Sequence, residues 1–200
     1  QEMDKFINNK KIKRILAYSF NHYLKTKNNL IERIKISKIS NLLSLYSNKS
    51  GLVMNSGWHT KIINLKRNTY VQWLPTAAVI FHSSLIKNKF FDESFGRYSY
   101  LEDLDFSLQI NPQRKSIFLV VANAKFVHLK DVIRTSFSFG YYEFFNRYKI
   151  VKKFNLNKIS FFFMAFSKLI FTTFSILVNY KNVFKLLGNI SAVIVCILFN

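Results

Sequence analysis

An apolar segment near the C-terminus limits most strongly what this chain can fold into. Residues 159–178 consist mainly of Phe, Ile, Leu and Val, and residues 186–199 form a second apolar run. As a helix rising ~1.5 Å per residue, the first run is long enough to cross a bilayer. Its side chains must therefore be covered either by protein or by lipid.

The polar residues of the first run argue against a simple membrane span. Lys168 lies near its middle, and a charge at the centre of a spanning helix costs about 2.5–3.5 kcal/mol on an insertion scale. We therefore expect a helix that lies in or dips into the membrane interface, with Lys168 reaching the headgroups. Residues 186–199 fit the first part of a spanning helix, and a buried pair of core helices is the alternative for both runs.

The charge of the chain restricts its partners. Its 30 basic and 10 acidic residues give a formal net charge of +20, which suits nucleic acid, an anionic membrane surface or an anionic substrate such as a nucleotide diphosphate. No nucleic-acid-binding motif is present, so we expect no nucleic-acid partner. Four lysines ahead of the apolar runs favour the cytoplasmic side of a membrane: Lys149, Lys152, Lys153 and Lys158. Cys196 is the only cysteine, which excludes an intramolecular disulfide and a cysteine-based metal site.

The N-terminal part of the chain predicts helices, then a loop and a strand. Apolar residues at helical spacing predict an amphipathic helix over residues 10–24. A polar loop follows over residues 48–68. Residues 71–82 change character and predict an extended stretch and then a buried strand, because Pro75 excludes a helix there. The small residues 76–78 would let the backbone approach a ligand closely, although an ordinary packed strand start explains them equally well.

Half of the acidic residues lie in one short segment, residues 89–110, as Asp92, Glu93, Glu102, Asp103 and Asp105. Leucines at helical spacing predict a helix that opens with the acids of LEDLD, where the helix dipole favours carboxylates. Glu102 and Asp105 would share one face of this helix, while Asp103 points elsewhere. These acids either form a reactive site or only cap the helix and pair with lysines.

The remaining segments predict a turn, strands and a helix. Residues 111–116 predict the turn, and residues 117–122 a strand. Residues 124–129 alternate and end at His128. Residues 135–154 predict an aromatic-rich helix that ends in basic residues.

Residues 71–128 resemble the acceptor-side half of family 2 inverting glycosyltransferases, most of all the rhamnosyltransferase-like branch. The family pattern has a tryptophan-containing strand, a step of small residues, a buried strand and F-D-E. An aromatic loop, E-D-x-D at the start of a helix, another strand and a histidine follow. The matching residues in this sequence are Trp73, Thr76-Ala77-Ala78, Phe91-Asp92-Glu93, Glu102-Asp103-Leu104-Asp105 and His128.

The resemblance implies an α/β fold, namely the C-terminal half of a GT-A fold followed by membrane-associated helices. The expected division is a basic helical segment at 1–50, the acceptor-side half at 51–155 and membrane-associated helices at 156–200. Such an enzyme transfers a sugar from a nucleotide-sugar donor to a glycan or lipid-linked acceptor with inversion. The expected setting is cell-envelope polysaccharide synthesis at the cytoplasmic face of the membrane.

The resemblance also implies roles for individual residues. Asp103 would be the general base that takes the proton of the acceptor hydroxyl, and His128 would bind the metal or touch the diphosphate. Glu102 would contact the acceptor or donor sugar. The other substrate-binding candidates are Trp73, Thr76, Ala77 and Asp105. Three of these residues have an alternative role. Trp73 could serve packing alone, and Asp105 could hold the loop. His128 could be an ordinary histidine at the end of a strand, with no ligand.

The sequence also departs from the family pattern. Thr76 stands where the family usually has Gly, and Gln109 stands where it often has Arg. No aspartate lies between Asp4 and Asp92, so the upstream D-x-D motif is absent. We therefore expect the C-terminal portion of an enzyme, inactive alone, with Mg²⁺ or Mn²⁺ held mostly by the missing N-terminal half. The alternatives are a non-catalytic glycan-binding or scaffolding relative and a basic nucleic-acid-binding protein.

Overall fold

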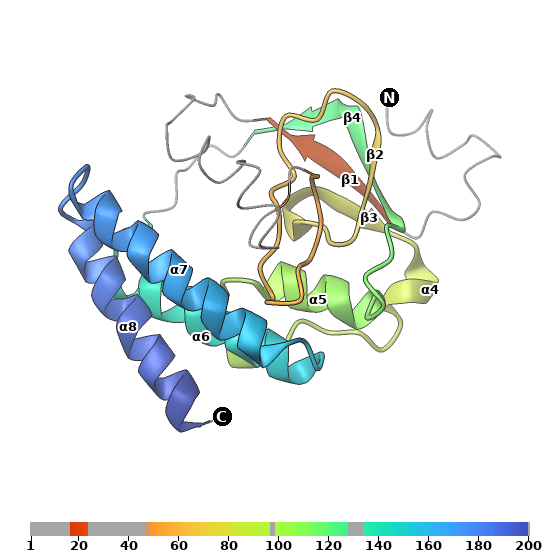
Figure 1. Cartoon of the computed structure of the whole chain (residues 1–200). Helices are drawn as coiled ribbons and strands as arrows, with labels where there is room; N and C mark the ends of the chain where they lie inside the picture. The colour runs from red at the N-terminus through yellow and green to blue at the C-terminus, as the bar shows by residue number, and fades with distance from the viewer. Residues whose placement is uncertain (1–16, 24–46, 48, 97–98, 128–133, 200) are drawn as a thin grey trace. The chain divides into compact units, whose positions relative to one another are not determined.

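The computed structural model describes residues 17–23, 47, 49–96, 99–127 and 134–199 (Figure 1). In these residues the chain is mixed α/β, with a four-stranded sheet and five α-helices. It divides into two compact units. The sheet unit comprises Gln1–Val53, His59–Phe91 and Asp103–Leu129, and the helical unit comprises Met54–Trp58, Asp92–Glu102 and Lys130–Asn200.

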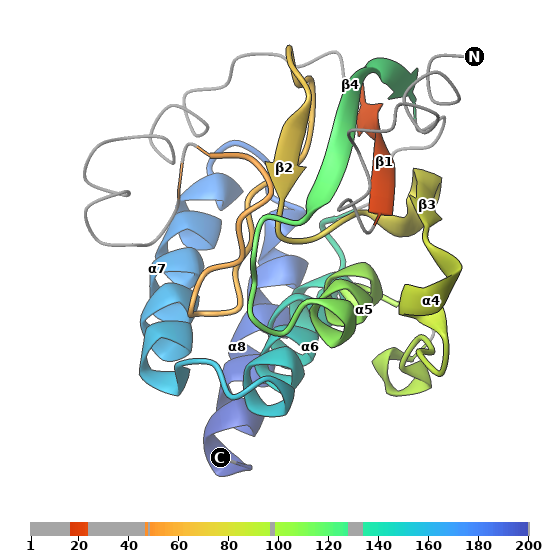
Figure 2. The same ribbon diagram turned by 90° about the vertical axis from the view of Figure 1, so that its right-hand side faces the viewer.

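The sheet of the sheet unit has the strand order β2-β4-β1-β3 (Figure 2). Its strands are β1 (Ala17–His22), β2 (Thr69–Val71), β3 (Val79–Phe81) and β4 (Phe118–Phe126). The central strands β1 and β4 run parallel, and the edge strands β3 and β2 run antiparallel to β1 and β4 respectively. A break in the β1–β4 register between Phe20 and Asn21 shifts the partner from Val121 to Lys125. The sheet is therefore mixed.

The strand β1 corrects the prediction of a helix over residues 10–24, of which residues 17–23 are described. Its buried positions alternate, at Ala17, Ser19 and Asn21, which is the period of a strand. Asn21 Nδ2 donates to the carbonyls of Leu65 and Ala122, at 2.9 and 3.0 Å. The prediction failed because the buried side chains are small or polar, so the bulky residues beside them suggested a helical stripe.

Residues 71–82 contain the predicted strand as β3, but this strand is not buried. After β2, a 3₁₀ turn, η2 (Thr76–Ala78), follows the extended Pro75, and β3 then pairs with β1. β3 is an edge strand, and Ile80 is exposed in its middle. Because one side of β3 lacks a neighbouring strand, the predicted burial does not hold there.

The predicted helix at the acidic segment is confirmed as α5 (Glu102–Ile110). Leu101, Leu104 and Leu108 are buried, as their spacing predicts. The ring of Phe106 lies 5.4 Å from that of Phe81 in β3. A short helix, α4 (Ser83–Ile86), follows β3, and the two predicted strands after α5 form the single strand β4.

The helical unit contains α6 (Phe137–Lys153), α7 (Lys158–Ile176) and α8 (Asn182–Leu198). The predicted helix over residues 135–154 is therefore confirmed. The hydroxyl of Ser136 caps α6 by accepting from the N–H of Phe139 at 3.1 Å, and the side chain of Asn157 caps α7 at the N–H of Ser160 at 2.7 Å. The short connections let the three helices lie side by side (Figure 1).

The helices α6 and α8 approach each other at two glycines. A Cβ atom on Gly140 would lie 2.1 Å from the carbonyl oxygen of Lys185, and one on Gly188 would lie 2.1 Å from that of Phe137. No side chain fits at such a distance from backbone. The two glycines therefore fix how closely the helices pack.

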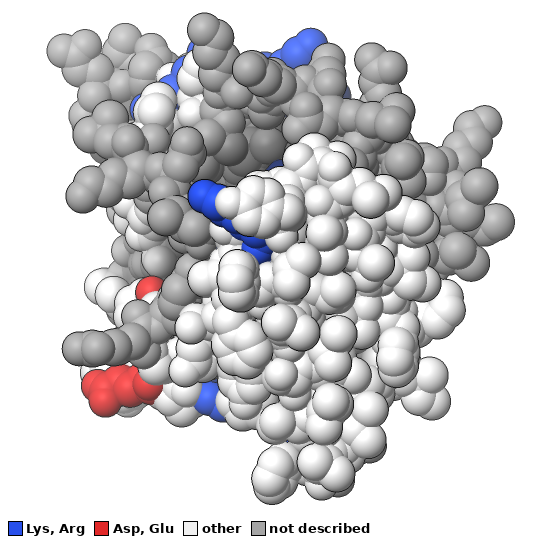
Figure 3. Space-filling model, turned by 90° about the vertical axis from the view of Figure 1, so that its left-hand side faces the viewer, with Lys and Arg blue, Asp and Glu red and all other residues white. Residues whose placement is uncertain are grey.

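The outer side of α7 and α8 is apolar. The face of the molecule on which these helices lie carries a wide area with neither basic nor acidic atoms, and blue and red atoms appear at its margin (Figure 3). Among the described helices, α7 alone is long and apolar enough to cross a membrane, and 22% of its apolar window is buried. One such helix does not by itself establish a membrane span.

Candidate functional site

The backbone just before α5 adopts an unusual conformation. Ser99 has a φ of 42° and Leu101 has a φ of 76°, both in the left-handed region. Such a residue other than glycine costs of order 1–3 kcal/mol and often marks a functional site. The buried side chain of Leu101 holds the turn in place, so the chain enters α5 with a fixed direction.

Asp103, the predicted base, lies in the first turn of α5. Its Oδ1 accepts a hydrogen bond from the N–H of Leu104 at 2.8 Å, and the side chain is half-buried. The N–H groups and the dipole of the helix start stabilise a carboxylate here. The side chain thus combines a fixed position with partial access to solvent, as a proton acceptor requires.

Two polar side chains that the sequence reasoning missed tie α5 to the segment after β2. The hydroxyl of Ser107 accepts from the N–H of Leu74 at 3.0 Å, and the amide of Asn111 donates to the carbonyl of Gln72 at 3.1 Å. Ser107 and Asn111 are buried and four residues apart, so they share one helix face. This i, i+4 polar pair within a leucine-rich helix was the available signal.

Asp105 lies inside the sheet unit. Its side chain is 0% exposed, and its Oδ2 accepts from Nε2 of Gln109 at 2.8 Å. Gln109 Nε2 also lies 3.2 Å from the carbonyl of Phe90, so the pair holds the loop before α5. This position fits the loop-holding role rather than substrate binding.

Trp73 is buried in the sheet unit. Its Nε1 donates to the carbonyl of Thr60 at 3.1 Å. Its ring packs edge-on against that of His59, with 4.4 Å between the ring centres. A ring that is 6% exposed has little surface to offer a sugar, so the structure favours packing. Thr76 is half-buried and Ala77 is exposed, so the small-residue step is open to a ligand.

Glu102 and Asp92 fall in the helical unit. The half-buried Glu102 begins α5, and its N–H donates to the carbonyl of Ser99 at 3.1 Å. Asp92 caps η3 (Glu93–Phe95) through the N–H of Ser94 and pairs with Lys153 at 2.8 Å. The hydrogen bonds from Lys153 and Ser94 lower the pKa of Asp92 to about 2. Asp92 thus orders the loop before α5 and pairs with a lysine.

The predicted metal ligand, His128, lies outside the described residues. Within the part of the chain that the structure describes, no three His, Cys, Asp or Glu side chains gather into a group that could hold a metal ion. The divalent metal, expected to be held mostly by the missing N-terminal half, therefore stays a prediction, and no chemical step is assigned to it.

A second polar group, also missed from the sequence, lies inside the helical unit. Glu143 of α6 pairs with Lys185 of α8 at 2.9 Å, and Asn189 donates to the carbonyl of Gly140 at 2.8 Å. Burial would raise the pKa of Glu143, but the charges of Lys168, Lys185 and Arg147 lower it to about 2. The charge of Lys168 thus acts on a buried carboxylate of α6, and its contact with lipid headgroups stays a prediction.

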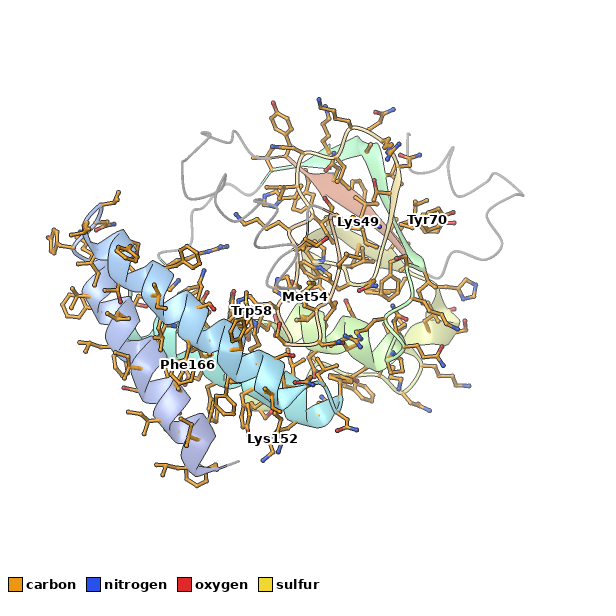
Figure 4. The ribbon with its side chains drawn as sticks, viewed as in Figure 1. Lys49, Met54, Trp58, Tyr70, Lys152 and Phe166 are labelled. Atoms are coloured by element: carbon orange, nitrogen blue, oxygen red, sulfur yellow. The ribbon has the colours of Figure 1, made fainter. Side chains whose placement is uncertain are left out.

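Arg147 completes the interior of the helical unit. It is 2% exposed, its guanidinium lies 4.2 Å from the ring centre of Trp58 (labelled in Figure 4), and its Nε donates to the carbonyl of Gly57 at 3.3 Å. Because these contacts are buried and specific, the segment Met54–Trp58 is held against α6.

The structure thus gathers Asp103, Asp105, Trp73, Thr76 and Ala77 in the sheet unit, where only Asp103 and the small-residue step are open to a ligand. Comparisons with known protein families, with curated proteins and with solved structures find no match for this chain.

Proposed function

We propose that this chain is the acceptor-side part of a GT-A glycosyltransferase. It would transfer a sugar from a nucleotide-sugar donor to a glycan or lipid-linked acceptor with inversion. The observation that carries the proposal is the half-buried carboxylate of Asp103 at the start of α5, on a helix bonded to Leu74, two residues before the small-residue step. The order of strand, step, strand, acidic helix and strand also agrees with the resemblance.

Hydrogen bonds from Ser107 and Asn111 to the segment just before the small-residue step give a register that supports this site. Asn111 bonds to Gln72, and Ser107 bonds to Leu74. Four helical residues rise about 6 Å and two extended residues span about 6.6 Å. The spacing of the bonding positions is therefore nearly equal in the two segments. Continuing by one turn, we infer that Asp103 faces Thr76.

In the proposed reaction Asp103 accepts the proton of the acceptor hydroxyl. The hydroxyl oxygen then attacks the anomeric carbon as the bond to the nucleoside diphosphate breaks on the opposite face, which inverts the configuration. Thr76 and Ala77 leave room beside the carboxylate for the acceptor.

We also propose that the chain works at the cytoplasmic face of a membrane, in cell-envelope polysaccharide synthesis. The apolar exterior of α7 and α8 supports a membrane location, and the lysines that precede α7 support the cytoplasmic side. The membrane would then be the source of a lipid-linked acceptor.

The test is Asp103→Asn in the intact gene product that contains this chain. We expect sugar transfer from a panel of nucleotide sugars to fall by about 10²–10⁴-fold, because the amide cannot accept the proton. Release of nucleoside diphosphate measures the rate, and circular dichroism checks that the variant folds.

The matched control is Glu93→Gln, which makes the same chemical change at an exposed acid of the same segment. We expect this variant to keep its activity. Full transfer by Asp103→Asn would overturn the proposed base. Glycan binding without transfer by the unmodified protein would favour the non-catalytic alternative.

A further inference from the structure

The outward side of α7 is a continuous apolar stripe. Large exposed side chains recur at spacings of three and four residues, which places them on one helix face. Phe166 is 52% exposed, Ile170 is 58% exposed and Phe174 is 64% exposed. Isolated exposed apolar residues are ordinary, but a stripe along a whole helix marks a surface that contacts something apolar.

The helix α8 carries a second stripe of the same kind. Its exposed apolar residues include Phe184, Leu187, Ile194 and Ile197, again at helical spacing. The opposite face of α8 is buried and contains Gly188, Asn189, Ala192 and Cys196. The two outer stripes lie on the face that bears few charges in Figure 3.

Several charged and polar groups of these helices lie on their inner side. Lys185 and Asn189 meet Glu143 on α6, and the charge of Lys168 also acts on that carboxylate. The side chain of Thr172 is buried and bonds to the carbonyl of Lys168 at 2.9 Å. Within the described part of the helical unit, an ion pair thus lies inside while large apolar side chains of α7 and α8 are exposed.

The charge balance identifies what this surface contacts. Residues 144–200 contain no acidic residue, while exposed lysines stand at the margins: Lys152 at the end of α6, Lys158 at the start of α7 and Lys181 before α8. A second copy of the chain would oppose lysine with lysine. An anionic phospholipid leaflet satisfies both the apolar stripes and the lysines.

The packing of α6 determines how the helices lie. α6 lies alongside α8 over its length. Gly140 contacts Lys185 near the start of both helices, and Nζ of Lys152 donates to the carbonyl of Phe199 at 3.1 Å near their ends. If α8 crossed the bilayer, α6 would carry its lysines into the hydrocarbon. Because charges there are strongly unfavourable, the axis of α8 must lie along the surface.

We propose that the outer stripes of α7 and α8 form one docking surface for an anionic leaflet, with both helices lying in the plane of the membrane. The inference rests on the membrane location proposed above and makes it specific. It does not depend on sugar transfer, so vesicle binding tests it separately from Asp103.

The first experiment is flotation of the 200-residue chain with vesicles that contain phosphatidylglycerol. Phe166→Glu/Phe174→Glu should lower the bound fraction at least ~10-fold, because charge is placed in the apolar contact. The control Ile86→Glu/Phe90→Glu makes a similar change at exposed apolar residues of the sheet unit and should bind normally. Lys158→Gln/Lys181→Gln should weaken binding about fivefold per lysine, and only to anionic vesicles.

The second experiment measures depth with nitroxide labels at Ile159, Ile170 and Leu177. An in-plane helix places all three labels at the same shallow depth, which supports the proposal. A deep label at Ile170 between two shallow ones would mean that α7 spans, and would overturn it. Absence of vesicle binding would also overturn it, whether the chain is then monomeric or forms dimers through this face.

Discussion

The sheet unit and the helical unit both have apolar cores, but the helical unit also buries an arginine and leaves one outer face apolar. In the sheet unit the largest fully buried residues are apolar, such as Leu74, Leu104 and Phe118. In the helical unit Arg147 is the largest, with Glu143 and Asn189 also buried, while Phe and Ile residues of α7 and α8 are exposed. The chain thus combines a unit with an apolar core and a unit whose outer face on α7 and α8 is also apolar.

The difference can be measured because each unit contains one of the two tryptophans. Trp58 packs against Phe144 and Arg147 in the helical unit, and Trp73 packs against His59 in the sheet unit. In a Trp73→Phe background the fluorescence follows the helical unit, and in a Trp58→Phe background it follows the sheet unit. The variants below are compared by urea unfolding in a nonionic detergent.

The largest effect is expected from Glu143→Ala. Removing this carboxylate leaves Lys185 and Arg147 buried without their counter-charge, which costs about 3–5 kcal/mol. Trp58 fluorescence should show the loss in the unfolding midpoint. The control Glu93→Ala removes an exposed acid of the same unit and should change stability by no more than about 0.5 kcal/mol. Equal effects of both variants would contradict a polar interior.

Gly140→Ala and Gly188→Ala come next. Alanine normally favours a helix over glycine, but here each new Cβ would meet backbone at 2.1 Å. We expect a destabilisation of about 1–3 kcal/mol from the forced separation of α6 and α8. Ser138→Ala, at an exposed position of α6, is the control and should not destabilise. A gain in stability from Gly140→Ala would show that the two helices pack less closely.

Ser107→Ala tests the hydrogen bond between Ser107 and Leu74 in the sheet unit. The N–H of Leu74 loses its acceptor in a buried setting, which costs about 1–2 kcal/mol. Trp73 fluorescence should report this loss. The exposed Ser116→Ala is the control. If Ser107→Ala is neutral, α5 is held by its leucines alone and the register toward Thr76 loses its support.

The smallest effect concerns the Asp92–Lys153 pair, which is partly exposed. The folded pKa of Asp92 is about 2, below its ordinary 3.8, so the pair stabilises fully above pH 3.8 and the gain is lost as pH falls through 2. Because the pair is solvated, we expect about 0.2–1 kcal/mol. Lys153→Ala should remove this pH dependence, as measured by acid titration of Trp58 fluorescence. An unchanged titration curve would exclude Lys153 as its cause.

The sequence predicted elements whose burial follows a simple period, and it missed those that polar groups determine. Leu101, Leu104 and Leu108 revealed α5 because each fills a core position. Ser19 and Asn21 concealed β1, because their burial depends on partners far along the chain. Local pattern cannot show such partners.

The candidate site follows the same rule. Asp103 could be found from its place in an acidic helix start, and its position there is confirmed. The tie between Ser107 and Leu74, which are 33 residues apart, and the pairing of Glu143 with Lys185 arise only from the tertiary fold. The roles of Asp103 and Glu102 in sugar transfer stay predictions.

The central position of β1 has a consequence for synthesis on the ribosome. Ser19 bonds to a residue 59 positions later and Asn21 to one 101 positions later, so this strand emerges long before its neighbours. At about 5–20 residues per second, the wait for β4 is about 5–20 s. During that time the strand's free edges are available to a chaperone, and translation speed becomes a determinant of yield.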